Sequence, residues 1–164
     1  MDGNVCNNIG RRGENLVCLR LMKFNVFNVY FLGEKAPIMD FLIEIIDKDT
    51  PYCCALQVKS TEVRNCYDKE GNMRTKVSEG DLKELIKRPL PTYVVGVDLN
   101  EEIIHIAPAF DENVKFNTIP PRLVLSNKDR EKDKSNLNKL KADIIRYWNE
   151  IGISGHKNFY QSIL

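Results

Sequence analysis

Two neighbouring apolar segments of the sequence carry polar side chains whose types suit the binding of metal ions and phosphate groups. Asp40 stands near the start of segment 39–47, and Gln57 and Lys59 stand near the end of segment 52–61. Successive side chains of a β-strand point to opposite faces of a sheet, so Gln57 and Lys59 project together. If the two strands pair, we expect these three side chains to converge at one end of the sheet, with a carboxylate beside a cation.

This combination of groups suits phosphodiester hydrolysis, in which a divalent metal neutralises the phosphate and activates a water molecule. Asp40 would be the principal carboxylate ligand, and the side-chain oxygen of Gln57 and the carbonyl of Val58 would add further oxygens. Oxygen ligands of this kind favour Mg²⁺ or Mn²⁺. Lys59 would hold the attacking water or the phosphate, and Glu14, on the first predicted helix, would supply a second acid. The residues therefore predict a metal-dependent phosphodiesterase.

The apolar periodicity along the chain predicts the elements that position these groups. We expect helices over residues 11–24, from a cap at Ser78 to Pro89, and from the charge run 128–134 to Gly152; strands over 25–32, 39–47, 52–61, 91–99 and 102–108; and a short extended piece at 122–125. The charge run is expected to be a solvated helix start, and residues 109–122 a loop. This order is typical of one α/β domain with a mixed sheet.

A polar excursion at residues 62–78 separates the third strand from the second helix, with a turn at 70–72. It carries four basic side chains around Tyr67, namely Arg64, Lys69, Arg74 and Lys76. The helix that follows has Glu79 and Asp81 in its first turn, where acids favour the positive end of the helix dipole.

The composition sets limits on the class of protein. The chain has 164 residues, of which 43% are hydrophobic, and its net charge is +1, so any contact with DNA needs a local basic patch. Five cysteines without metal-ligand spacing predict free thiols in a reducing compartment. No signal peptide or apolar run long enough to span a bilayer is present, so we expect a cytoplasmic protein without membrane contact. His105, between two isoleucines, is expected to be structural.

With these residues in view, the chain resembles the PD-(D/E)XK nuclease superfamily. The motif at residues 10–14 (Gly-Arg-Arg-Gly-Glu), then Asp40, then the motif at 57–60 (Gln-Val-Lys-Ser) follow the order of that family's helix and strands. The likeness is greatest to a small prokaryotic group of largely uncharacterised function, and Mrr-type and Holliday-junction resolvase-like nucleases are more distant. It covers roughly residues 9–110, and Gln57 stands where the superfamily usually has an acid.

The resemblance implies a restriction endonuclease-like fold, with a mixed sheet of about five strands flanked by helices. Residues 1–126 would form the nuclease-like core, and residues 127–164 a C-terminal helical extension of the same domain. The implied activity is that of a Mg²⁺- or Mn²⁺-dependent DNA endonuclease in restriction, repair or phage defence. Its catalytic residues would be Glu14, Asp40, Gln57 and Lys59, of which the first three would bind the metal.

Three further residues are candidates for phosphate contacts. Arg11 and Arg12 lie beside Glu14, and Ser60 follows Lys59. The alternatives are plain surface charge for the two arginines and an ordinary strand-end hydroxyl for the serine.

Other readings of the whole chain stay open. The domain would bind nucleic acid or a partner protein without catalysis if its site is inactive, and an unrelated α/β interaction protein is the third alternative. A partner protein from a defence or mobile-element operon and a homodimer are both expected candidates. The apolar C-terminal residues are the candidate dimer contact, with packing on the sheet as their alternative: Trp148, Phe159, Tyr160 and Leu164.

Overall fold

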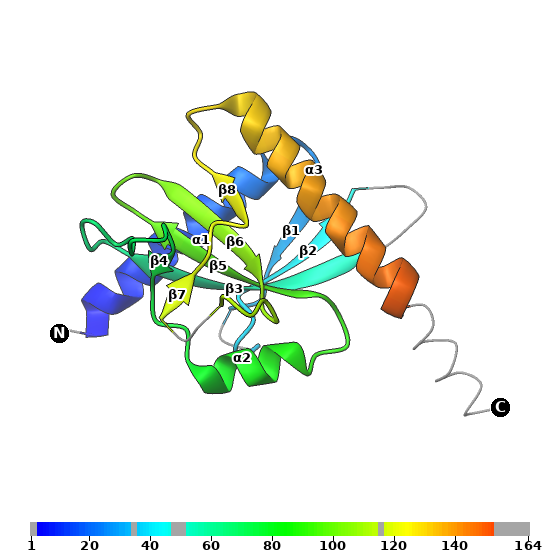
Figure 1. Ribbon diagram of the computed structural model, residues 1–164, viewed down its shortest axis with the longest axis horizontal. Helices are drawn as coiled ribbons and strands as arrows, with labels where there is room; N and C mark the ends of the chain where they lie inside the picture. The colour runs from blue at the N-terminus through cyan, green and yellow to red at the C-terminus, as the bar shows by residue number, and fades with distance from the viewer. Residues whose placement is uncertain (1–2, 34–35, 47–51, 115–116, 153–164) are drawn as a thin grey trace.

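The computed structural model describes residues 3–33, 36–46, 52–114 and 117–152 (Figure 1). In chain order the elements are α1 (Gly3–Met22), β1 (Phe27–Phe31), β2 (Phe41–Ile45), β3 (Cys53–Thr61), β4 (Met73–Arg74), α2 (Glu79–Ile86), β5 (Thr92–Asp98), β6 (Ile103–Pro108), β7 (Thr118–Ile119), β8 (Leu123–Leu125), α3 (Arg130–Tyr147) and the π-helical turn η2 (Trp148–Gly152).

The architecture is an α/β fold built on a mixed sheet of six strands in the order β1-β2-β3-β5-β6-β8. Strands β3 and β5 are parallel, and every other neighbouring pair in this sheet is antiparallel. A parallel pair needs a crossover connection, and here the crossover contains the excursion at 62–78 and α2. The predicted mixed-sheet class is confirmed, with six strands rather than about five, and β4 and β7 pair as a second small sheet.

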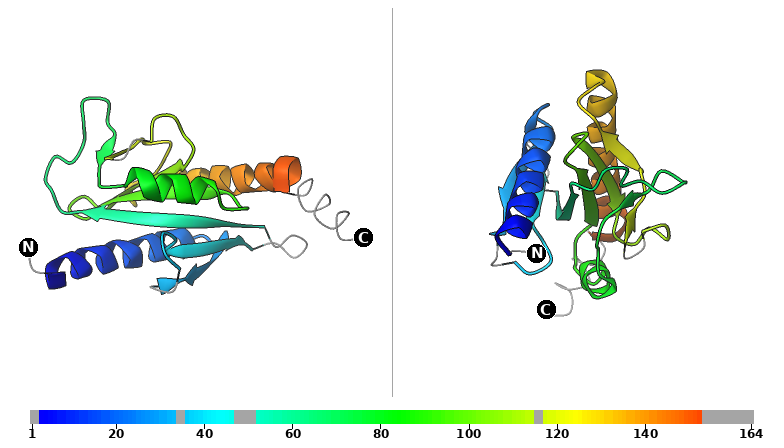
Figure 2. Two further views of the ribbon diagram at one scale, coloured as in Figure 1. Left: turned by 90° about the horizontal axis from the view of Figure 1, so that it is seen from below. Right: turned by 90° about the vertical axis from the view of Figure 1, so that its left-hand side faces the viewer.

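The strand alternation separates two apolar cores. On one face, Leu56 and Val58 of β3 lie in a cluster with residues of α1 and α3, including Val17 and Leu140. On the other face, α2 and the small β4–β7 sheet cover Val94 of β5. In Figure 2, α1 lies on one side of the long strand β3, and α2 with the excursion lies on the other. Gln57 and Lys59 therefore face α2.

Several boundaries differ from the predicted ones. Helix α1 begins at Gly3 rather than at residue 11, because the glycines and asparagines of residues 3–10 have low helix propensity and hide the few apolar residues among them. The predicted loop at 109–122 contains β7, whose two residues are too few to show alternation. The link at 47–51 lies outside the described residues.

The charge run at the start of α3 (residues 128–134) is not uniformly solvated, contrary to prediction. Asp129 caps the helix as an exposed residue would, but Asp133 is only 2% exposed. Its carboxylate accepts hydrogen bonds from the N–H groups of Ser126 and Asn127, at 3.0 and 2.8 Å. A buried carboxylate with two such donors fixes the loop between β8 and α3.

The last described residues of the chain, at the end of α3 and in η2, contact the sheet. The indole of Trp148 donates to the carbonyl of Cys53 at 2.8 Å, and its ring stacks on Tyr52. For Trp148 the structure therefore shows packing on the same domain. Phe159, Tyr160 and Leu164 lie outside the described residues. Among the helices that are described, none has the length and hydropathy needed to cross a membrane.

Candidate metal centre and nucleic-acid interface

Asp40 occupies a rigidly held position immediately before β2. Its N–H donates to the carbonyl of Leu56 at 2.8 Å, and its own carbonyl accepts from Leu32 at 2.9 Å. Its carboxylate oxygen Oδ2 accepts the N–H of Val58 on β3 at 2.6 Å. Both neighbouring strands thus hold the backbone, and the carboxylate takes over a ladder hydrogen bond where β2 begins.

Gln57 and Lys59 meet an acid from α2 on the same face of the sheet. Oδ2 of Asp81 lies 3.2 Å from Nε2 of Gln57 and 3.8 Å from Nζ of Lys59. The N-cap of α2 sets the position of Asp81, since its N–H donates to the hydroxyl of Ser78 at 3.0 Å. The helix start therefore holds this carboxylate over β3.

The side-chain oxygen of Gln57 is buried without a hydrogen-bond partner. Gln57 is only 2% exposed, so this oxygen cannot turn to solvent. The contact with Asp81 assigns the nitrogen and oxygen of the Gln57 amide, because a carboxylate accepts a hydrogen bond from the NH₂ group and repels the oxygen. A buried acceptor left unpaired is costly, and such an atom calls for an explanation.

Burial, and to a lesser extent the charge of a neighbouring carboxylate, raises the pKa values of two carboxyl groups at the site. Burial is the largest cause for Asp40; the charge of Asp81 raises its pKa further, whereas the Val58 N–H and Lys59 lower it. For Glu14 on α1, burial raises the pKa and the negative charge of Asp40 adds to the effect. A bound cation would relieve this repulsion.

The donor set fits one hard cation that keeps part of its water shell. Within the described ranges, no three His, Cys, Asp or Glu side chains are arranged to hold a metal by themselves. Mg²⁺ commonly binds through only one or two carboxylates and retains several waters. Asp40 and the unpaired Gln57 oxygen would be its protein ligands, and the Val58 carbonyl leaves β3 on the same edge as the N–H that contacts Asp40.

The structure brings the four predicted catalytic residues into one region. Gln57 and Lys59 lie on the α2 side of β3, where they contact Asp81. The Asp40 carboxylate lies at the start of β2 against the Val58 amide, where the charge of Lys59 acts on it and its own charge acts on Glu14. The sequence analysis does not identify Asp81 as a site residue, because the helix dipole already accounts for an acid in the first turn of a helix. The short cap motif Ser-x-x-Asp was the available signal.

Close packing between α1 and β3 explains why residue 13, in the motif at 10–14, is a glycine. Gly13 is buried, and a Cβ built on it would collide with the hydroxyl and Cβ of Ser60. Ser60 therefore lies beneath α1, its hydroxyl covered and unpaired, on the opposite face of β3 from Lys59. In this arrangement the hydroxyl seats the helix and does not face the Asp40 region.

Basic side chains lie on both sides of the far end of β3. Arg11 and Arg12 are exposed on α1, and Arg12 pairs with Glu62 where the excursion begins. The excursion lies across β3 from the first half of α1 (Figure 2). Its four basic side chains (Arg64, Lys69, Arg74 and Lys76) are exposed, and the ion pairs of the described residues include none of them.

Tyr67 ties the excursion to the sheet. Its hydroxyl donates to Oδ2 of Asp98 at 2.9 Å, and its ring packs against His105. His105 is 4% exposed, its Nδ1 lies 3.3 Å from the carbonyl of Ile119, and burial lowers its pKa. This environment agrees with the structural role expected for His105.

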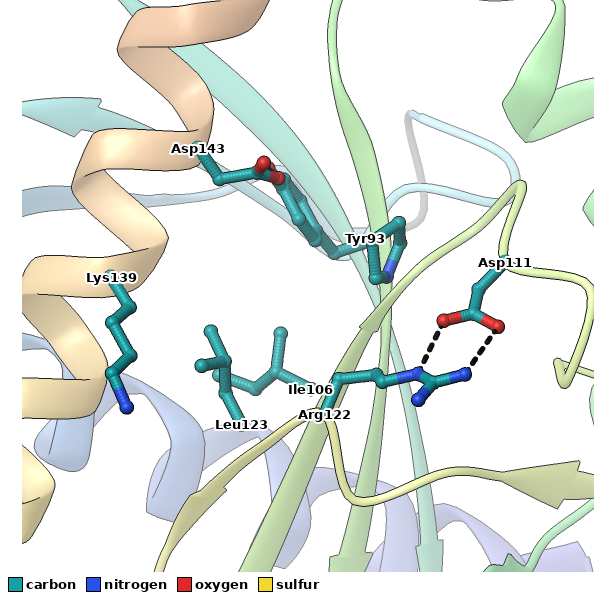
Figure 3. Close-up of a pocket in the computed structure, with 8 residues that line it drawn as sticks. Tyr93, Ile106, Asp111, Arg122, Leu123, Lys139 and Asp143 are labelled. Carbon is teal, nitrogen blue, oxygen red and sulfur yellow. Dashed lines mark hydrogen bonds and ion pairs between the residues drawn. The ribbon is translucent and has the colours of Figure 1, made fainter.

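A separate pocket of about 270 Å³ lies on the α3 side of the sheet (Figure 3). Its charged groups are largely neutralised within the wall. Arg122 contacts Asp111 through two hydrogen bonds of 2.6 and 3.1 Å, and Asp143 accepts from Tyr93 at 2.6 Å. Because this pocket is on the opposite face from Lys59, it is not part of the Asp40 site.

Comparison with protein-family models, curated proteins and solved structures gives no match. The function is therefore inferred from the geometry of the site.

Proposed function

We propose that the protein is a metal-dependent DNA endonuclease of the restriction endonuclease-like class. The observation that carries the proposal is the unpaired, buried oxygen of Gln57, on the same face of β3 as Lys59. The Asp40 carboxylate contacts the next residue of β3, Val58, and lies within reach of the charge of Lys59. A divalent cation would satisfy the Gln57 oxygen. It would also stabilise the charged forms of Asp40 and Glu14, whose pKa values are raised first by burial and further by the charge of a neighbouring carboxylate. When bound, the metal would supply charge neutralisation at the phosphate and a more acidic water.

The chain's own residues would have distinct roles. Asp40 and Gln57 would orient the cation, and Lys59 would hold the attacking water or a phosphate oxygen at its ammonium group. Asp81 would position Lys59 and keep the Gln57 oxygen turned away from α2. Glu14 would add negative charge from the α1 side and, with its raised pKa, would exchange a proton with water at a higher pH than an ordinary glutamate.

The exposed basic residues support a polyanionic substrate. Arg11 on α1 and the cations of the excursion are separated by the end of β3, so a nucleic-acid backbone that crosses there would meet basic side chains on both sides. The net charge of +1 makes such a local arrangement necessary for binding.

A cleavage assay with matched variants tests the proposal. We expect the wild type to cut plasmid DNA with Mg²⁺ or Mn²⁺ and to stop in chelator. Lys59→Ala should lose cleavage by about 10²-fold or more, with DNA binding nearly unchanged, because one phosphate contact among several contributes little to affinity. Lys83→Ala removes an exposed lysine of α2 that pairs with Glu79, and it should cut normally.

The outcomes separate the competing functions. Cleavage that survives Lys59→Ala would indicate a contaminating nuclease or a different site. Binding of DNA by the wild type without cleavage in any metal would indicate a nuclease-like binding domain. Failure to bind DNA at all would favour a protein-interaction domain.

A further inference from the structure

Strand β1 forms an edge of the main sheet that no other described residue covers by pairing. It lies at one end of the strand order, and among the described residues its one strand neighbour is β2. At the opposite edge, β8 has only three residues and packs with α3. The five residues of β1 are thus the longer open edge of the described sheet.

The register with β2 shows which backbone groups of β1 point outward. Ile46 donates to the carbonyl of Val26, and Leu32 donates to that of Asp40, so alternate residues from Val26 to Leu32 face β2. In an antiparallel pair the remaining residues have their N–H and C=O groups on the other side. Phe27, Val29 and Phe31 therefore present these groups to the open edge.

We propose that β1 pairs with β1 of a second copy of this chain, antiparallel about a two-fold axis at Val29. In this register Val29 lies opposite its own copy, and Phe27 lies opposite Phe31 of the other protomer. All three are the residues whose N–H and C=O groups point outward, so each pair exchanges both of its hydrogen bonds. A register shifted by one residue would align groups that already bond to β2.

The sequence of the edge favours a copy of itself as the occupant. Natural edge strands are commonly blocked by lysine, proline or a bulge, and β1 (Phe-Asn-Val-Tyr-Phe) has none of them. Residues 24–33 contain no charged side chain, so the two-fold register opposes no like charges. Phe31 is 62% exposed and Tyr30 is 48% exposed. Two adjacent aromatic residues with this much exposed surface are unusual on a part of a protein that binds no partner.

The exposed side chain that the pairing would cover is Phe31. It packs against Phe41 at a centroid distance of 5.5 Å and would lie opposite Phe27 of the other protomer, whose own side chain is only 2% exposed in the core. Tyr30, on the other face, would lie opposite Asn28. Isologous contacts of this kind, with the same patch on both subunits, are the commonest form of homo-oligomer.

The two-fold axis of such a pair is perpendicular to the joined sheet, so both protomers present the same face to the same side. If the proposed nuclease function holds, the two Asp40 sites would open in one direction, as cleavage of both strands of a duplex requires. The pairing itself does not depend on that function, and its test uses no cleavage assay.

The mass of the protein in solution, measured by light scattering at micromolar concentration, tests the interface. The wild type should be a dimer, and Phe31→Lys should be a monomer with an unchanged circular dichroism spectrum. Leu19→Lys makes the same chemical change at a 70% exposed position of α1 and should remain a dimer. A monomeric wild type would overturn the proposal, and so would a Phe31→Lys variant that stays dimeric.

Disulfide trapping tests the register. Val29→Cys should cross-link to its own copy on mild oxidation, because directly opposed residues of a hydrogen-bonded pair have Cα atoms about 5.5 Å apart. Tyr30→Cys is the control, since its own copy would be a diagonal neighbour about 7–8 Å away, beyond the reach of an unstrained disulfide. Equal cross-linking of both variants, or of neither, would contradict the Val29-centred pairing, and a dimer formed through the C-terminal segment would give that result.

Discussion

Gly13 of α1 lies so close to Ser60 of β3 that a side-chain carbon on residue 13 has no space. We expect Gly13→Ala to destabilise the fold by about 1–3 kcal/mol through overpacking. Gly10→Ala is the matched control, because no atom lies near its Cβ position, and it should be neutral or stabilising by up to about 1 kcal/mol. Urea denaturation gives both free energies of unfolding.

The same contact can be checked by a double-mutant cycle. Adding Ser60→Gly to Gly13→Ala removes both atoms that collide with the new methyl group, so part of the lost stability should return. Additive losses from the two substitutions would show that the close approach is not what makes Gly13 necessary.

Asp81 should matter more to catalysis than another acid of the same helix turn. Asp81→Asn weakens the hold on Gln57 and Lys59, and we expect cleavage to fall by about tenfold or more while DNA binding is kept. Glu79→Gln removes a first-turn charge from α2 as well, but the ion pair of Glu79 in the described part of the chain is with the exposed Lys83. Single-turnover rates should therefore separate the two variants, and equal rates would mean that only the helix dipole is involved.

Gln57→Glu should increase the response of the protein to metal. The new carboxylate faces Asp81, so without metal it adds like-charge repulsion and should lower the melting temperature. With Mg²⁺ it adds an anionic ligand, and we expect a larger metal-induced rise in melting temperature than in the wild type, with cleavage retained or increased. A variant that neither responds to metal nor cuts would count against Gln57 as a ligand.

The stability of Asp40→Asn should depend on pH in a defined direction. The raised pKa of Asp40 means that the folded protein holds this proton more tightly than the unfolded chain does, so stability is lost as the pH rises through that pKa. The asparagine variant avoids this loss and should be more stable than the wild type at pH 7 without metal. Below the ordinary aspartate pKa of 3.8 the difference should vanish. Thermal melts across pH test this, and a destabilised variant at pH 7 would contradict it.

Strand alternation made the core of the site predictable from sequence. Gln57 and Lys59 are two apart on β3, so their shared face follows from the extended backbone alone. The antiparallel pairing of β2 and β3 then places Asp40 against the Val58 amide and within reach of the charge of Lys59. The contact of Asp81 could not be predicted in this way, because it depends on the path of the chain through residues 62–78, between β3 and α2.

Elements too short to show a periodic pattern could not be predicted from the sequence either. Strands β4 and β7 have two residues each, and they pair over Gly96, where a Cβ would meet Met73 and Ile119. The burial of Asp133 depends on two backbone donors in the preceding loop, which a run of charged residues does not reveal. Mixed-sheet class and element order were predictable because long apolar segments dominate both.

The hydrogen bond from the Val58 amide to Asp40 gives the site a spectroscopic reporter. An amide proton that donates to a carboxylate changes its chemical shift when that carboxylate gains a proton or a cation. In a ¹⁵N-correlated NMR titration, the Val58 resonance should therefore follow the ionisation of Asp40 directly. The occupancy of the proposed metal centre can thus be followed at one backbone atom, without substrate and without any change to the sequence.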